Sequence, residues 1–194
     1  DKGEVDIDKI KKLITNKTKI IAITHLSNVT GAIMPIKKIV DLASEKKIPV
    51  LVDGCQGAPH LKIDMQELGC DFYAISCHKM YGPTGVGVLY AKKKWLDVLP
   101  PYQGGGGMIE EVKKDNITFP GSPTKYEAGT LQTAEVVGFS ESIRFIEDVG
   151  IKNIMQHEKE ILEYGLEKIK KNNSIRIIGD PKYRGSIISF TIKG

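Results

Sequence analysis

The sequence predicts an α/β fold: a mixed, mainly parallel sheet covered by helices, followed by the start of a smaller α+β domain. Strand-length apolar runs alternate with helical patterns through most of the chain, and these runs are apolar on both faces, as in parallel sheets. Near the C-terminus the order changes to one long amphipathic helix and then two strand-like runs. We expect the larger domain over residues 1–147 and the beginning of the smaller one over 148–194.

The elements of the larger domain follow from apolar spacing. Apolar residues at three- and four-residue intervals predict helices, and continuous apolar runs predict strands. Asp6 or Asp8 can cap the first helix, and Pro35 suits the first turn of the second. In chain order the predicted elements are helix 6–14, strand 19–24, helix 35–46, strand 49–53, helix 65–68, strand 72–75, strand 86–90, helix 92–99 and helix 131–147.

The smaller domain begins with a predicted helix over 151–171, preceded by Gly150 as a helix C-cap or hinge. Strands are predicted over 175–178 and 186–192. The inward-facing residues of the helix should be Ile154, Ile161, Leu162, Leu166 and Ile169.

Residues 100–130 lose all periodicity and are rich in proline and glycine. A structureless loop of that length is uncommon inside a compact domain. We therefore expect this segment to pack against a partner subunit or to cover a site.

Composition excludes several classes of function. With 41% hydrophobic and 27% charged residues and a net charge of +4, the chain is typical of a soluble globular protein. The lysine runs fall on predicted solvent faces of helices with few aromatics nearby, which is unlike a nucleic-acid-binding surface. No apolar run approaches the roughly 20 residues that span a bilayer, so we expect no membrane partner.

The cysteines predict a reducing compartment. Cys55, Cys70 and Cys77 match neither a zinc pattern nor a disulfide framework, so no metal site is expected. The chain opens at Asp1 without methionine or a signal peptide and stops directly after a strand-like run. Both ends are expected to be cut from a longer protein.

Polar residues directly follow three predicted strands. Asn28, Asp53 and the run 76–79 occupy these positions, and ligands of open α/β sheets bind at the carboxyl ends of strands. Lys79 lies between two apolar runs, where desolvation would lower the pKa of its amine and make it nucleophilic. We expect one crevice lined by these groups.

A carboxylate paired with a desolvated lysine is the minimal requirement of a pyridoxal phosphate site. The lysine forms a Schiff base, and Asp53 would keep the ring nitrogen protonated. The alternative is that Asp53 and Lys79 form an ion pair at the strand ends, and spacing alone does not decide between the two. For Cys55 and Cys77, packing of a small side chain is favoured over a nucleophilic role.

Five motifs together resemble the cysteine desulfurases of the sulfur-mobilising (Suf) type. These enzymes are class V aminotransferases among the fold-type I pyridoxal phosphate enzymes, and the resemblance runs over essentially the whole chain. The histidine–lysine pair followed by GPTG points to the Suf group rather than to relatives with GPKG. The motifs are THLSNVTGAIMPI, VDGCQGAPHLKIDMQELGCDFY, SCHKMYGPTGVGVLY, PPYQGGGGMI and YEAGT.

The resemblance implies a pyridoxal 5'-phosphate site to which this chain contributes several residues. Lys79 would bind the cofactor covalently, and Asp53 would be the partner of its ring nitrogen. Asn28 and Gln56 would lie at its phenolic oxygen.

The phosphate would have a separate set of partners. Ser76 and His78 would bind the phosphate of the same subunit, and Thr130 would reach the phosphate of the other subunit's cofactor. The resemblance therefore also implies a homodimer.

The implied reaction converts L-cysteine, or L-selenocysteine, to L-alanine. Sulfur would pass as an enzyme persulfide to an acceptor protein of the Suf system for iron–sulfur cluster assembly. The implied compartment is the bacterial cytoplasm or a plastid-like organelle.

The family's persulfide-forming cysteine and substrate-binding arginine would follow this segment, and its ring-stacking histidine and threonine phosphate loop would precede it. We therefore expect a central fragment that lacks the nucleophile and is inactive alone. Other class V activities stay open here, namely selenocysteine lyase, kynureninase-like and aminotransferase chemistry, as does a non-catalytic dimer or scaffold chain.

Overall fold

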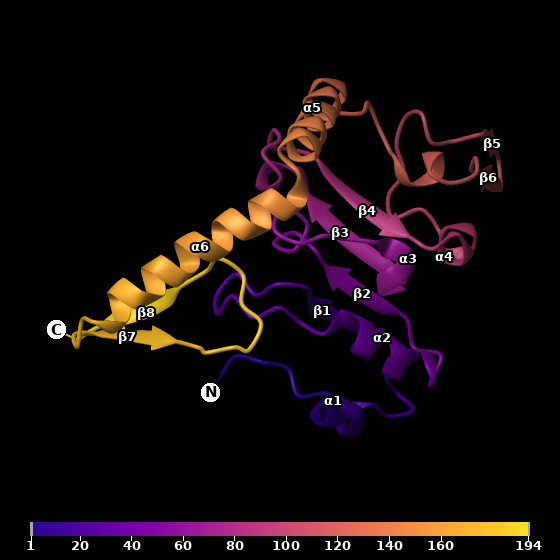
Figure 1. Ribbon diagram of the computed structural model, residues 1–194. Coiled ribbons are helices and arrows are strands. Elements are labelled where there is room, and N and C mark those ends of the chain that lie inside the picture. The colour runs from indigo at the N-terminus through magenta and orange to yellow at the C-terminus, as the bar shows by residue number, and fades with distance from the viewer. Residues whose placement is uncertain (1, 194) are drawn as a thin grey trace.

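A four-stranded sheet in the order β1-β2-β3-β4 lies at the centre of the computed structural model, which describes residues 2–193 (Figure 1). The strands are β1 (Ile21–Thr24), β2 (Val50–Asp53), β3 (Phe72–Ser76) and β4 (Gly87–Ala91). The first three are parallel, and β4 pairs antiparallel with β3. This confirms the mixed, mainly parallel sheet. Asp1 and Gly194, the outer bounds of the two expected domains, lie outside the described residues.

Four helices accompany the sheet. They are α1 (Ile7–Leu13), α2 (Ile36–Ser44), α3 (Met65–Leu68) and α4 (Lys93–Val98). Asp6 is the N-cap of α1, because its carboxylate accepts hydrogen bonds from two backbone N–H groups of the first turn.

The hydrophobic core lies between α2 and one face of the sheet. Val50 and Val52 of β2 and Tyr73 of β3 are almost fully buried there together with Ile36 of α2. Because side chains alternate across a strand, Asp53 belongs to the opposite face, where it is exposed. The core thus anchors the strands, and their polar ends stay accessible.

The C-terminal part contains α5 (Thr133–Val149), α6 (Ile151–Lys170) and an antiparallel pair of strands, β7 (Ile175–Ile178) and β8 (Ser189–Ile192). Gly150 separates the helices with a φ of +84°, a conformation that glycine adopts without strain. From there α6 runs to the β7–β8 hairpin, at the end of the molecule away from β4 (Figure 1).

The burial along α6 differs in one place from the expected pattern. Ile154 and Leu162 are buried as predicted, but 56% of Ile161 is exposed. The prediction for Ile161 was wrong because no element among residues 2–193 covers its side chain.

Residues 100–130 are more ordered than their composition predicts. They hold a short hairpin of β5 (Glu111–Lys113) and β6 (Asn116–Thr118). The Tyr126 hydroxyl joins this segment to α4, lying 2.8 Å from the carbonyl oxygens of both Leu96 and Leu99.

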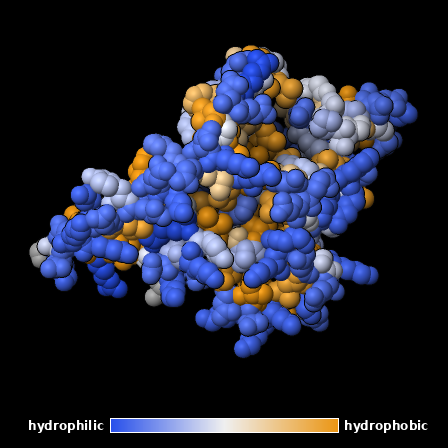
Figure 2. Space-filling view, in the orientation of Figure 1, coloured by the Kyte–Doolittle hydropathy of each residue, from blue (hydrophilic) through white to orange (hydrophobic). Residues whose placement is uncertain are grey.

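Hydrophilic residues cover most of the face seen in Figure 2, with apolar patches near its centre. Several exposed apolar side chains belong to α5, among them Val136, Val137 and Phe145. No helix within residues 2–193 has the length and apolar character needed to cross a membrane.

Candidate functional site

Asp53 and Lys79 lie at the same edge of the sheet. Asp53 ends β2, and its Oδ1 accepts a hydrogen bond of 3.0 Å from the backbone N–H of Cys55. Lys79 ends the 3-10 turn Cys77–Lys79, which directly follows β3, the strand next to β2. The Cys55 thiol lies close enough to both charged groups to be affected by each of them. The structure therefore brings together the two residues on which the sequence prediction depends.

The ion-pair alternative finds no support among residues 2–193, where no contact within 4.0 Å joins the carboxylate of Asp53 to the ammonium group of Lys79. Both side chains are exposed. Among the described residues Lys79 is therefore not desolvated, and that prediction was wrong. The reason is that Lys79 lies in the turn beyond β3 and not within the strand.

Ser76 and His78 form a second polar pair beside Lys79. The Ser76 hydroxyl lies 2.9 Å from His78 Nδ1. When Nδ1 donates, the hydroxyl accepts that bond and keeps its own proton for another acceptor. The pair can therefore present donors to an anion at the end of β3.

Gln56 lies in the turn that follows Asp53. Its amide Nε2 is 3.3 Å from His60 Nε2. Asn28 is exposed in a turn after β1, which is shaped by hydrogen bonds from Val29 and Thr30 backbone N–H groups to the Ser27 hydroxyl. Both predicted amides thus follow strand ends.

Two buried rings support the turn that carries Asp53 and Gln56. A Cβ added to Gly54 would lie 1.8 Å from the ring of Tyr73, and one added to Gly57 would lie 3.0 Å from His25. The rings are joined by a hydrogen bond of 2.9 Å between His25 Nδ1 and the Tyr73 hydroxyl. At Gly54 only glycine allows the backbone this close, and at Gly57 a larger residue would have to push His25 aside.

The same ring pair is tied to Asp53 through the backbone. The N–H of His25 donates to the carbonyl oxygen of Asp53 over 2.8 Å. Burial lowers the pKa of His25 to about 4 and raises that of Tyr73, so the imidazole is neutral at physiological pH. Sequence reasoning did not find this pair; the two glycines around Gln56 were the available signal.

Thr130 belongs to a different segment of the chain from the other predicted residues. It is exposed at the end of the 100–130 segment, just before α5. No hydrogen bond or ion pair between described residues joins it to Asp53, Lys79 or Ser76. This placement leaves the predicted role of Thr130 toward a second subunit as a prediction.

The three thiols are unsuited to nucleophilic attack. Burial raises the pKa of Cys70 and Cys77, and both side chains are fully enclosed. The pKa of Cys55 is raised by burial and then by a hydrogen bond and charge from Asp53, an effect that Lys79 only partly opposes. A raised pKa leaves little reactive thiolate at neutral pH.

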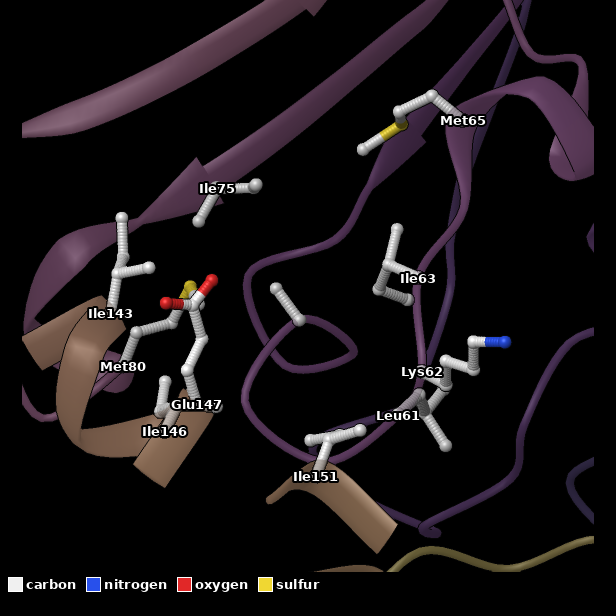
Figure 3. Close-up of a pocket in the computed structure, with 11 residues that line it drawn as sticks. Leu61, Lys62, Ile63, Met65, Ile75, Met80, Ile143, Ile146, Glu147 and Ile151 are labelled. Carbon is white, nitrogen blue, oxygen red and sulfur yellow. The ribbon is translucent and has the colours of Figure 1, made fainter. Parts of the chain in front are cut away.

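An apolar cavity of about 530 Å³ borders the site without being part of it (Figure 3). Ile75, Met80 and Ile143 line it with other apolar side chains, and Lys62 and Glu147 are its charged residues. Such a lining suits apolar side chains and not an anionic cofactor.

Comparisons with known proteins show the family to which the chain belongs. The aminotransferase class-V family matches residues 1–194. A probable cysteine desulfurase of Halalkalibacterium halodurans is 44% identical over 98% of this chain, and a cysteine desulfurase of Wigglesworthia glossinidia brevipalpis is 44% identical over 99%. In each case the chain covers 47% of the relative, so it spans about half the length of these proteins.

Solved structures give the same result for the fold. The cysteine desulfurase CsdA from Escherichia coli superposes with a TM-score of 0.91 at 36% identity, over 96% of this chain and 46% of that one. A cysteine desulfurase from Thermococcus onnurineus gives a TM-score of 0.93 at 30% identity, over 100% and 48%. With a family match over its whole length and this fold, the chain belongs to the aminotransferase class-V family.

Proposed function

We propose that the full-length protein is a pyridoxal phosphate-dependent cysteine desulfurase that converts L-cysteine to L-alanine. The observation that carries this proposal is the placement of Lys79 and Asp53 at the ends of adjacent parallel strands. The family to which the chain belongs, and the cysteine desulfurases among its relatives, support the choice of reaction.

The polar groups present fit this cofactor. The exposed amine of Lys79 is free to bond to the aldehyde of the cofactor. The exposed carboxylate of Asp53 can accept a hydrogen bond from a protonated ring nitrogen. Ser76 and His78 supply hydrogen-bond donors for the phosphate. Gln56 and Asn28 would bind the phenolic oxygen.

When bound, the cofactor supplies an electron sink for bonds at the substrate's α and β carbons. Asp53 would favour this chemistry, because its carboxylate would stabilise a proton on the ring nitrogen. In the overall reaction the carbon–sulfur bond of cysteine breaks, a sulfur–sulfur bond forms with an enzyme thiolate, and the β carbon takes up a proton. No external reductant is needed.

The sulfur-accepting cysteine would lie outside this chain. Cys55, Cys70 and Cys77 all have raised pKa values, and two of them are fully buried. This supports the assignment of all three to packing. The chain by itself would then be inactive.

We also propose that the enzyme acts as a homodimer in the cytoplasm and passes sulfur to a Suf-type acceptor for iron–sulfur cluster assembly. Thr130 would bind the phosphate at the partner's site. The exposure of Thr130 and of Tyr102, 93% of which is accessible, supports a role for this segment in subunit contact.

Borohydride trapping tests the central assignment. In the full-length protein, reduction should leave one covalent cofactor adduct on the peptide that contains Lys79, detected by mass spectrometry. Lys79→Ala should abolish the adduct and the associated absorbance, because no other described amine lies at these strand ends.

Lys62→Ala is the matched control, since Lys62 is an exposed lysine that lines the neighbouring apolar cavity. It should keep the full adduct. An adduct that persists in folded Lys79→Ala would overturn the site, and loaded wild-type enzyme that releases no alanine from L-cysteine would overturn the reaction.

A further inference from the structure

A chain of three side chains leads from α6 to the predicted cofactor site. Glu158 Oε1 lies 2.7 Å from His60 Nδ1, and His60 Nε2 lies 3.3 Å from the amide nitrogen of Gln56. Glu158 belongs to the helix that opens the smaller domain. Gln56 belongs to the turn after Asp53. The chain therefore connects the two predicted domains.

Hydrogen-bond chemistry fixes the direction of these contacts. A carboxylate only accepts, so the proton between Glu158 and His60 belongs to Nδ1. An amide nitrogen only donates, so His60 Nε2 accepts from Gln56. One N–H of Gln56 is then committed to His60, and its second N–H remains available to a ligand.

The hydrogen bond between Glu158 and His60 is partly shielded from solvent. The side chains of His60 and Glu158 are each 21% exposed, and both line a small cavity of about 160 Å³ together with Leu162 of α6. Leu162 is itself buried. Packing thus holds Glu158 in reach of His60, where partial burial strengthens the interaction.

We propose that His60 and Glu158 are positioning residues that hold the nitrogen end of the Gln56 amide toward the cofactor's phenolic oxygen. Without them the amide can turn and present its oxygen, which an anionic phenolic oxygen repels. This inference rests on the proposed function, because it assigns Gln56 a cofactor contact.

A double-mutant cycle on cofactor affinity tests the proposal. Pyridoxal phosphate is titrated into the full-length apoenzyme and followed by absorbance. Glu158→Ala and His60→Ala should each weaken binding about three- to tenfold and shift the absorbance maximum in the direction that Gln56→Ala does. In a Gln56→Ala background, neither substitution should weaken binding further.

Two further variants separate positioning from helix packing. Glu158→Gln keeps an acceptor for His60 Nδ1 and should bind the cofactor within about twofold of wild type. Glu160→Ala, on the same helix but bonded to Gln156, should have no effect.

Additive losses in the Gln56→Ala background would overturn the positioning role, since they would mean that Glu158 acts through the fold alone. Unchanged affinity in folded His60→Ala would do the same. Either result leaves the Lys79 adduct intact, whereas its absence from wild-type protein would overturn the proposed function itself.

Discussion

At the scale of single residues, the buried His25–Tyr73 pair determines how the Asp53 turn is held. His25 contacts Asp53 through its backbone and Tyr73 through its ring. Its pKa of about 4 follows from burial, which favours the neutral imidazole. Acid conditions, which favour a protonated imidazole, should therefore weaken the packing that holds the Asp53 turn in place.

Stability should fall between about pH 6.5 and pH 4 because of His25. The unfolded chain takes up a proton near pH 6.5 and the folded one only near pH 4, so the unfolded state binds more protons in this window. The loss amounts to about 3 kcal/mol. Urea unfolding of full-length protein at several pH values measures it, and His25→Asn should remove this part of the decline.

Tyr73→Phe is the matched control. It removes the hydrogen bond to His25 Nδ1 but keeps the ring that buries the imidazole. Because burial is the cause of the low pKa, the decline below pH 6.5 should persist. A flat profile for wild type between pH 6.5 and 4 would contradict the assignment.

At the scale of elements, the strands and most helices were predictable from sequence because their apolar runs are continuous and bounded by turn residues. The β5–β6 hairpin was not, since its strands are short and largely exposed and carry no apolar pattern. Ile161 fits the apolar spacing of α6, but no element among the described residues packs against its side chain.

Part of the site was predictable for a similar reason. Asp53, Ser76 and Lys79 lie at strand ends, which the order of elements reveals. The contact between His60 and Glu158 joins residues 98 positions apart, and it depends on how α6 packs against the larger domain. Local spacing contains no information about that packing.

The turn after β2 should tolerate no side chain at its first position. Gly54→Ala would place a Cβ 1.8 Å from the Tyr73 ring, which forces the ring or the backbone to move. We expect a loss of roughly 1–3 kcal/mol in the free energy of unfolding, measured by urea denaturation. Gly104→Ala meets no atom within 4 Å and should change stability by less than about 1 kcal/mol; equal effects would refute the contact.

At the scale of the whole molecule, Asp71 joins elements on the edge of the sheet opposite the site. Its carboxylate accepts hydrogen bonds from Val50 N–H at 3.1 Å and Trp95 at 2.8 Å, and Lys94 lies at 2.9 Å. Burial alone would raise its pKa, but the hydrogen bonds from Trp95, Lys94 and Val50 and the charge of Lys92 together outweigh this and lower it. One ionised group thus connects β2, β3 and α4.

Asp71→Asn should destabilise the full-length protein by about 2–3 kcal/mol at pH 7, because the amide cannot accept from both Val50 and Trp95 and leaves Lys94 unpaired. A carboxyl group whose pKa is lowered in the folded state contributes stability that is fully present above the pKa of the unfolded state. This stability is lost as the pH falls through the pKa of the folded state. The difference from wild type should therefore shrink below about pH 4. A difference that stays constant from pH 7 to pH 3 would contradict an ionic role.

The antiparallel pairing of β3 with β4 has a kinetic consequence. The parallel pairs need crossovers through α2 and α3, whereas β3 and β4 are joined only by the stretch from Cys77 to Val86, which carries Lys79. Loop closure is cheaper and faster for short connections. The hairpin around the proposed catalytic lysine is therefore the part of this sheet whose strands can meet earliest, before the longer crossovers bring Asp53 alongside.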